Sequence, residues 1–131
     1  MYDDEIKVCM VVDDSPVIRK VAQHILGDFG YRVLEIESGH AALERCVREG
    51  MPDAMLLDWQ LSDMEGHDFL MALMSQPMAR KPYIVYATTV FEAEDVARAM
   101  YNGADDYIMK PFTRLTLQDK FASFARWARV A

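Results

Sequence analysis

The sequence is poor in cysteine and histidine, has no long apolar run, and carries more acidic than basic side chains. Its formal net charge of -7 at pH 7 argues against direct binding to nucleic acid. No stretch approaches the roughly 20 apolar residues of a membrane-spanning helix, and the first residues are acidic where a signal peptide would be basic. We therefore expect a cytoplasmic protein with no membrane insertion.

The few cysteines and histidines are not arranged for zinc binding or for a disulfide. Cys9 lies in an apolar run and Cys46 in a helical pattern, so we expect two buried, unpaired side chains. The histidines are scattered over predicted helices and are expected at the surface: His24, His40 and His67. Without a Cys/His cluster, a zinc site is excluded.

Apolar runs alternate with segments of helical periodicity, which is typical of βα units around a parallel sheet. Strands are predicted at about residues 8–12, 32–36, 54–57, 83–87 and 107–109. Helices are predicted at about residues 16–29, 39–49, 67–76 and 92–101, followed by a last helix. A chain of this length fits a single domain, residues 1–131, with little room for a fused DNA-binding module. We expect an α/β fold.

Two helices show their expected buried faces clearly. The first has Ser15 as its cap, Pro16 at its first position and Gly30 after its end. Its predicted stripe is Ile18, Val21, Ile25 and Phe29, and that of the last helix is Leu117, Phe121, Phe124 and Ala128.

Reactive polar residues follow four of the predicted strands: Asp13-Asp14, Asp58, Thr88-Thr89 and Lys110-Pro111. Each has an ordinary structural explanation, since aspartates form turns, threonines cap helices, and a loop lysine can simply be solvated. However, the carboxyl ends of parallel strands meet at one edge of the sheet, where open α/β folds place their sites. The convergence of all four therefore favours a functional site.

The residue types at this edge point to phosphoryl transfer. Three clustered carboxylates repel one another, and a hard divalent cation holds them ionised through oxygen ligands. Mg²⁺ suits best, because it takes few protein carboxylates and leaves positions for phosphate oxygens. A carboxylate beside a metal, a lysine and a hydroxyl can act as a nucleophile, so Asp58 is the candidate for an acyl phosphate.

The ordered set of motifs resembles the receiver domain of two-component response regulators, over about residues 6–130. The matching segments are Val11-Val12-Asp13-Asp14-Ser15, Leu57-Asp58-Trp59, Met64-Glu65-Gly66, Ala87-Thr88 and Lys110-Pro111-Phe112. The resemblance implies a flavodoxin-like (βα)5 fold, with a five-stranded parallel sheet of order 2-1-3-4-5 and helices on both faces.

The resemblance also implies roles for individual residues. Asp58 would accept a phosphoryl group from a histidine kinase or phosphotransfer protein, Lys110 would pair with it, and Thr88 would hydrogen-bond it. Mg²⁺ would be held by Asp13, Asp14, Asp58 and the backbone carbonyl of Gln60. Tyr107 matches the switch aromatic of the family, and Lys110-Pro111 its cis peptide.

In this interpretation the protein is a stand-alone response regulator and not an enzyme, apart from catalysing its own Mg²⁺-dependent phosphorylation and dephosphorylation. It would bind a downstream target protein through the face of the fourth helix, fifth strand and fifth helix. Candidate contacts on that face are Phe91, Met100, Tyr101 and Tyr107. Neither the kinase nor the target is identified by the sequence.

Several features depart from the family pattern or leave alternatives open. Ser62 stands in the loop after the phosphoacceptor where the family usually has proline, and Thr89 replaces a smaller residue. Gln60 and Val90 occupy positions that tune the phosphate lifetime in the family. The main alternative is a pseudo-receiver, a constitutive interaction module, although such proteins usually lose acids or the lysine.

Three further alternatives have weaker support. A haloacid-dehalogenase-type hydrolase would need an Asp-x-Asp pattern after the first strand, and a flavin carrier would need a glycine-rich loop there. A nucleotide ligand for Arg126, Trp127 and Arg129 is less favoured than a solvated helix face.

Overall fold

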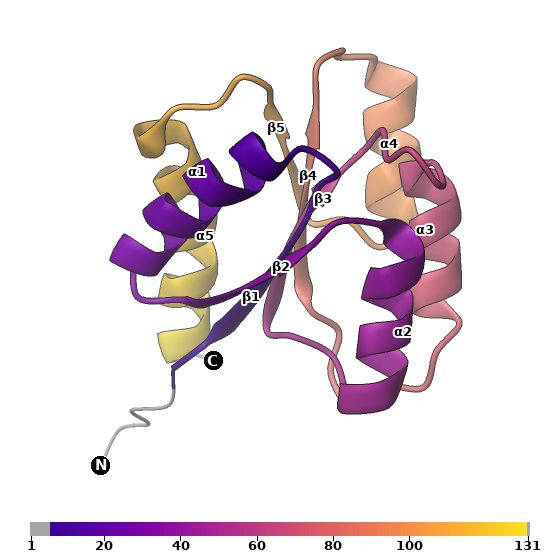
Figure 1. The fold of residues 1–131 in the computed structure, drawn as a ribbon, viewed down its shortest axis with the longest axis horizontal. Coiled ribbons are helices and arrows are strands. Elements are labelled where there is room, and N and C mark those ends of the chain that lie inside the picture. Colours follow the sequence, from indigo (N-terminus) through magenta and orange to yellow (C-terminus); the bar gives the residue numbers. More distant parts are fainter. Residues whose placement is uncertain (1–5, 131) are drawn as a thin grey trace.

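The computed structural model describes residues 6–130, except for the side chains of residue 123 and residues 125–130. In this range five strands alternate with five helices (Figure 1). The elements are β1 (Val8–Val12), α1 (Pro16–Asp28), β2 (Arg32–Ile36), α2 (Gly39–Glu49), β3 (Ala54–Asp58), α3 (Gly66–Met74), β4 (Tyr83–Thr88), α4 (Ala93–Tyr101), β5 (Asp106–Met109) and α5 (Arg114–Val130). Every predicted element is confirmed, with ends that move by one or two residues.

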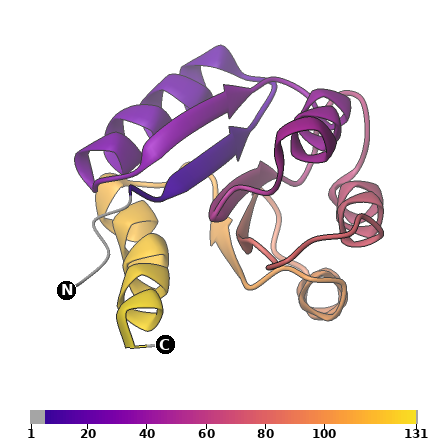
Figure 2. The same ribbon diagram turned by 90° about the horizontal axis from the view of Figure 1, so that it is seen from below.

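The strands form one parallel sheet in the order β2-β1-β3-β4-β5. Helices α1 and α5 cover one face, and α2, α3 and α4 cover the other (Figures 1 and 2). The flavodoxin-like arrangement is therefore confirmed. Because the chain winds outward from β1 in both directions, the carboxyl ends of β1 and β3 form the topological switch point, where open α/β folds place their sites.

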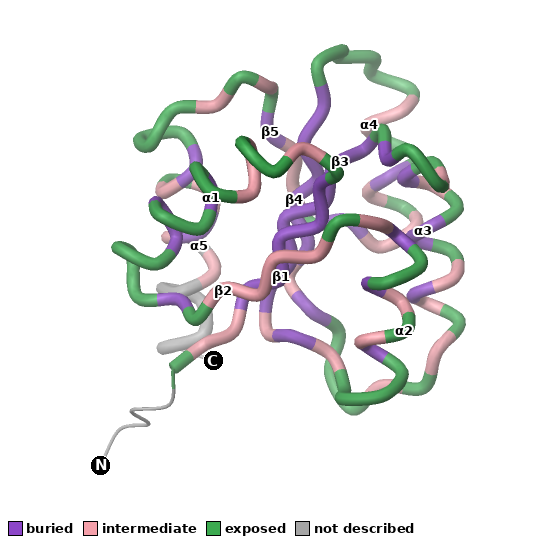
Figure 3. The backbone as a smooth tube through the Cα atoms, in the orientation of Figure 1, coloured by how far each residue is buried: buried purple, intermediate pink, exposed green. Residues whose placement is uncertain are grey.

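Side chains that alternate along the strands divide the apolar interior between the two faces. In β1, Cys9 and Val11 face α1 and α5, whereas Met10 and Val12 face α2 and α3. The central strands are buried along most of their length (Figure 3). Burial on both faces explains why these strands read as continuous apolar runs in the sequence. Cys9 and Cys46 are both buried and free, as expected.

The predicted face of α1 was wrong by part of a turn. Ala22, Ile25 and Leu26 are buried, whereas Val21 is 43% and Phe29 is 37% exposed. The small Ala22 side chain lets the helix approach the sheet closely, so the contact face centres on it rather than on the larger Val21. In α5, Leu117 and Phe121 are fully buried as predicted, whereas the Ala128 side chain lies outside the described residues.

The expectation of surface histidines was wrong for His67. His24 and His40 are exposed, but the side chain of His67 is only 12% exposed. Its ring packs edge-on against Trp59, with 4.6 Å between the ring centroids. The indole supplies an apolar wall that the helical pattern of the sequence did not reveal. No helix within residues 6–130 has the combination of length and apolar character needed to cross a bilayer.

Candidate functional site at the carboxyl edge of the sheet

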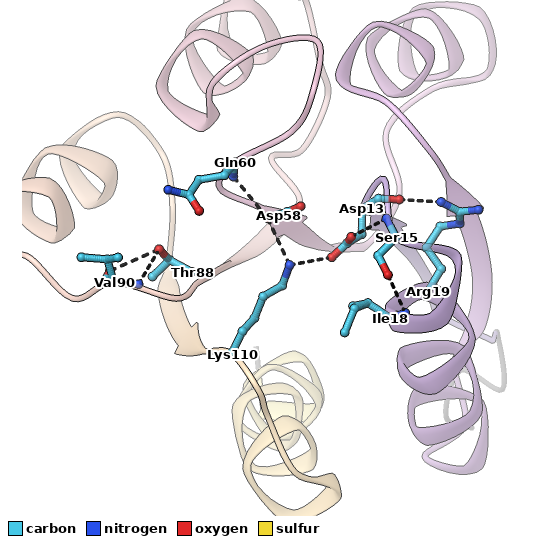
Figure 4. A network of polar contacts seen from close by, with 9 residues as sticks. All are labelled: Asp13, Ser15, Ile18, Arg19, Asp58, Gln60, Thr88, Val90 and Lys110. Atoms are coloured by element: carbon cyan, nitrogen blue, oxygen red, sulfur yellow. Dashed lines mark hydrogen bonds and ion pairs between the residues drawn. The ribbon is translucent and has the colours of Figure 1, made fainter.

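The strand ends bring the predicted site residues together at one edge (Figure 4). Asp58 is the last residue of β3, Asp13 follows β1 directly, and Lys110 follows β5. Asp13 is 3% and Asp58 7% exposed, whereas Asp14 is open to solvent. Two buried carboxylates on adjacent strands need compensation by a cation.

Lys110 supplies that compensation. Its Nζ lies 2.9 Å from Asp13 Oδ2 and 3.2 Å from Asp58 Oδ1, and its side chain is only 15% exposed. The interpretation of Lys110 as a solvated loop charge is therefore wrong. The Lys110–Pro111 peptide bond is cis, as the family resemblance implied.

The loop after β1 is held by a chain of hydrogen bonds. Asp13 Oδ1 accepts a bond from the Ser15 amide at 2.9 Å, and Ser15 Oγ caps α1 by accepting from the Ile18 amide at 3.3 Å. Arg19 Nη1 donates to the Asp13 carbonyl at 2.7 Å. Asp13 is thus both a turn residue and a site residue, and these two explanations are compatible. The role of Arg19 was missed, because nothing in the helical pattern marks its reach to this loop.

The electrostatics of the site leave Asp58 strained. Burial raises the pKa of Asp58, the negative charge of Asp13 raises it further, and the Gln60 amide and Lys110 only partly oppose this. Burial lowers the pKa of Lys110, but its contacts with Asp13 and Asp58 outweigh burial and raise the pKa overall. Lys110 therefore keeps its positive charge, but the carboxylates around it carry more negative charge than Lys110 can neutralise.

A hard divalent cation fits this excess of negative charge. One carboxylate oxygen from each of Asp13, Asp14 and Asp58 lies within 4.8 Å of the others. Carboxylate oxygens are the ligands Mg²⁺ prefers, and the exposed Asp14 leaves the cluster open to solvent, so the ion could keep several waters. The Gln60 amide donates to Asp58 Oδ1 at 3.2 Å, which fixes the backbone of this fourth predicted ligand next to the cluster.

Thr88 ends β4 on the opposite side of Asp58 from Asp13 (Figure 4). Its hydroxyl is engaged with Val90, donating to the carbonyl and accepting from the amide at 3.2 Å each. Helix α4 begins only at Ala93 with Glu92 as its cap residue, so the explanation of Thr88 and Thr89 as its caps is wrong.

Tyr107 lies one strand further from the carboxylates, half-buried on β5. Its ring centroid is 6.0 Å from that of Tyr86 and 5.5 Å from that of Phe91. The Lys120 ammonium lies 5.3 Å from the centroid of the Tyr107 ring. Of the predicted contact residues, Phe91 is 52% and Tyr101 91% exposed. Met100 instead packs against the core. The side chains of Arg126, Trp127 and Arg129 lie outside the described residues.

The comparisons with known proteins agree with this architecture. A sequence model of the response regulator receiver domain matches residues 9–122. The chemotaxis protein CheY1 of Helicobacter pylori is 32% identical over 112 residues, which cover 85% of this chain and 90% of that protein. The structure of chemotaxis protein CheY4 of Vibrio cholerae superposes with a TM-score of 0.84 at 28% identity, covering 91% of this chain and 98% of that one.

A longer relative is the phosphate regulon transcriptional regulatory protein PhoB of Escherichia coli, 36% identical over 104 residues. That match covers 79% of this chain but only 45% of PhoB, so the chain spans less than half the length of this relative.

The fold, with its acidic cluster and lysine at the carboxyl edge of a parallel sheet, agrees with the sequence match to a signalling domain. The chain belongs to the response regulator receiver domain family of two-component signalling. Receivers are signalling proteins rather than classical enzymes, and they generally bind Mg²⁺ at an acidic pocket. They interact with histidine kinases or phosphotransfer proteins and with downstream targets.

Proposed function

We propose that Asp58 accepts a phosphoryl group from a histidine kinase or phosphotransfer protein and thereby switches a protein-binding face. The observation that carries this proposal is the Lys110 ammonium, which joins Asp13 and Asp58 at 2.9 and 3.2 Å beside the exposed Asp14. A pseudo-receiver has no need for two buried carboxylates and a buried lysine, whose desolvation is unfavourable. All the charged groups needed for transfer are retained, which disfavours the constitutive alternative.

In the transfer step, one Asp58 carboxylate oxygen forms a bond to phosphorus while the bond from phosphorus to the donor nitrogen breaks. The donor imidazole keeps the electron pair of that bond and takes up a proton from solvent. Lys110 stays protonated and pairs with an oxygen of the transferred group, which would draw it partly away from Asp13. Bound Mg²⁺, held by Asp13, Asp14, Asp58 and the Gln60 carbonyl, would neutralise charge as the phosphoryl group approaches.

The switch would begin at Thr88. A phosphoryl oxygen on Asp58 offers the Thr88 hydroxyl a charged acceptor in place of the Val90 carbonyl, and hydrogen bonds to charged acceptors are stronger. Turning the hydroxyl toward Asp58 releases Val90 and frees space for Tyr107 to turn inward. The face formed by α4, β5 and α5 would then change, with the exposed Phe91 and Tyr101 among its contacts.

The test is incubation with acetyl phosphate and Mg²⁺, followed by intact-protein mass spectrometry. We expect one acid-stable, base-labile phosphoryl group that is lost in Asp58→Asn. Asp53→Asn is the matched control, because Asp53 is also partly shielded but lies at the amino end of the sheet. Phosphate on Asp58→Asn at the parent rate would disprove the assignment, and a parent that takes no phosphate yet binds its target would favour the pseudo-receiver.

A further inference from the structure

The loop between β3 and α3, residues 59–65, carries Gln60 and is closed at its base. The Gly66 amide donates to the Trp59 carbonyl at 3.0 Å, and Gln60 pairs with Glu65 in an isolated antiparallel bridge. A Cβ at Gly66 would collide with the Trp59 ring, so the indole lies directly on this glycine. The base of the loop is therefore fixed, but its tip needs an anchor elsewhere.

That anchor is Asp63, whose carboxylate reaches across to the start of α2. Asp63 Oδ1 accepts from the Gly39 amide at 3.0 Å, and Oδ2 accepts from the His40 amide at 2.9 Å. The His40 ring, through Nδ1, lies 2.7 Å from Oδ2. Both amides belong to the first turn of α2, where helical amides lack partners within the helix.

The neighbouring residue strengthens the same contact. Met64 packs against Gly39 so closely that a Cβ there would lie 2.6 Å from the Met64 sulfur. Burial opposes the charge of Asp63, but the amides of His40 and Gly39 outweigh it and lower its pKa to about 2. The carboxylate is therefore ionised throughout the physiological range, so both amides have a charged acceptor there.

We propose that Asp63 is a positioning residue that holds the Gln60 carbonyl in place for Mg²⁺ by fastening its loop to the start of α2. This inference rests on the proposed function of the acidic cluster. Ser62 stands where the family usually has a rigid proline, and an exposed serine does not restrain the backbone in that way. The contact between Asp63 and α2 supplies the restraint from outside the loop.

The alternative is that Asp63 merely caps α2 and contributes to stability alone. The two roles differ in what a substitution changes. A cap affects the free energy of unfolding, whereas a positioning residue also affects Mg²⁺ affinity and the local opening of its loop. Partners that orient a metal ligand typically change metal affinity by about 10- to 100-fold. Because Asp63 acts through a single carbonyl ligand, we expect about a 3- to 10-fold loss.

The experiment compares Asp63→Ala with the parent by calorimetric Mg²⁺ titration and by amide hydrogen exchange, both without a phosphodonor. We expect 3- to 10-fold weaker Mg²⁺ binding and faster exchange at Gln60 and Glu65. With acetyl phosphate, the Mg²⁺ concentration for half-maximal phosphorylation should rise, while the rate at saturating Mg²⁺ returns to the parent value. Asp63→Asn should lie between the two, because its amide retains one acceptor oxygen.

Two controls separate the anchor from charge and from stability. Glu65→Gln removes an exposed charge from the same loop and should leave Mg²⁺ affinity within about twofold, because the remaining electrostatic effect is screened. Asp53→Ala removes a carboxylate of the same side-chain exposure, 24%, that accepts from the Val8 amide at the other end of the sheet. It should lower stability alone.

Mg²⁺ affinity of Asp63→Ala within about twofold of the parent would overturn the inference, as would an equal loss of affinity in Glu65→Gln. Failure of the parent to accept phosphate would instead count against the proposed function. The titration and exchange measurements are read without phosphate, so the two failures are distinguishable.

Discussion

Asp58→Asn is expected to stabilise the protein against unfolding in the absence of Mg²⁺, although it removes the proposed phosphoacceptor. The parent places an ionised Asp58, 7% exposed, beside the buried Asp13 and the exposed Asp14. Asparagine has nearly the same shape and keeps an oxygen that can accept from the Gln60 amide. The substitution therefore removes the charge with little change in packing.

The magnitude follows from the distances. Carboxylate oxygens within 4.8 Å of one another repel by at least about 3.5 kcal/mol at an effective dielectric constant of about 20, and solvent screens the repulsion from the exposed Asp14 further. Lys110 at 3.2 Å attracts Asp58 by about 5 kcal/mol on the same scale, but desolvation of the buried charge opposes this by several kcal/mol. Lys110 also keeps Asp13 as a partner in the variant. We expect a net gain of about 1–2 kcal/mol at pH 7.

The assay is urea unfolding followed by circular dichroism, with a chelator present, at pH 7 and at a pH low enough to protonate Asp58. A carboxyl group whose pKa is raised on folding binds its proton more tightly in the folded state, so its favourable contribution is present at low pH and lost as pH rises through the folded pKa. The advantage of Asp58→Asn should therefore be largest at neutral pH and should shrink on acidification.

Asp53→Asn is the control, because this substitution should lower the free energy of unfolding whereas Asp58→Asn should raise it. Asp53 accepts from the Val8 amide at 2.8 Å and pairs with Arg80 at 3.3 Å, so its substitution should destabilise the protein by about 1 kcal/mol. If Asp58→Asn instead lost 1 kcal/mol or more at pH 7 without metal, the electrostatic strain at Asp58 would be refuted.

Three further predictions concern the same site. Asp14→Ala should weaken Mg²⁺ binding by about tenfold or more in calorimetry, because it removes a carboxylate ligand, and undiminished binding would contradict its role. Lys110→Ala should still bind Mg²⁺ but respond poorly to phosphorylation, and behaviour identical to the parent in both phosphorylation and target binding would reduce Lys110 to a structural charge. Beryllofluoride, a phosphoryl mimic, should shift amide NMR signals across residues 88–113, and changes confined to the surroundings of Asp58 would exclude the proposed route to the target-binding face.

Much of the fold could be predicted because each element carries its own local signals. Ser15 and Pro16 mark the start of α1, and Gly30, with a φ of 102°, follows its end in a conformation that favours glycine. The site residues could be predicted for a related reason: the ends of parallel strands meet whatever the details of packing. The proximity of Asp13, Asp58 and Lys110 could therefore be predicted from the topology of the sheet.

What could not be predicted depends on distances between segments that are remote in the sequence. The contact of Asp63 with Gly39 spans 24 residues, and neither residue's local pattern indicates the other. The sequence predicts His67 at the surface, because the helical pattern does not show the Trp59 ring that covers it in the structure. The buried face of α1 shifted for a similar reason, since the small Ala22 is a contact point only once a sheet lies beneath it.

The strained carboxylate and the anchored loop bear on the same binding event. A bound Mg²⁺ would offset the repulsion between Asp58 and Asp13, so relief of that repulsion would contribute to the free energy of metal binding. A further unfavourable term would be the ordering of the proposed fourth ligand, the carbonyl of Gln60, which lies two residues beyond Asp58. Because Asp63 and Met64 already hold that loop against α2, little conformational entropy is left to lose when the metal binds. On the proposed role of Asp63, a receiver without the loop proline would keep a preorganised metal site through a restraint from the neighbouring helix α2.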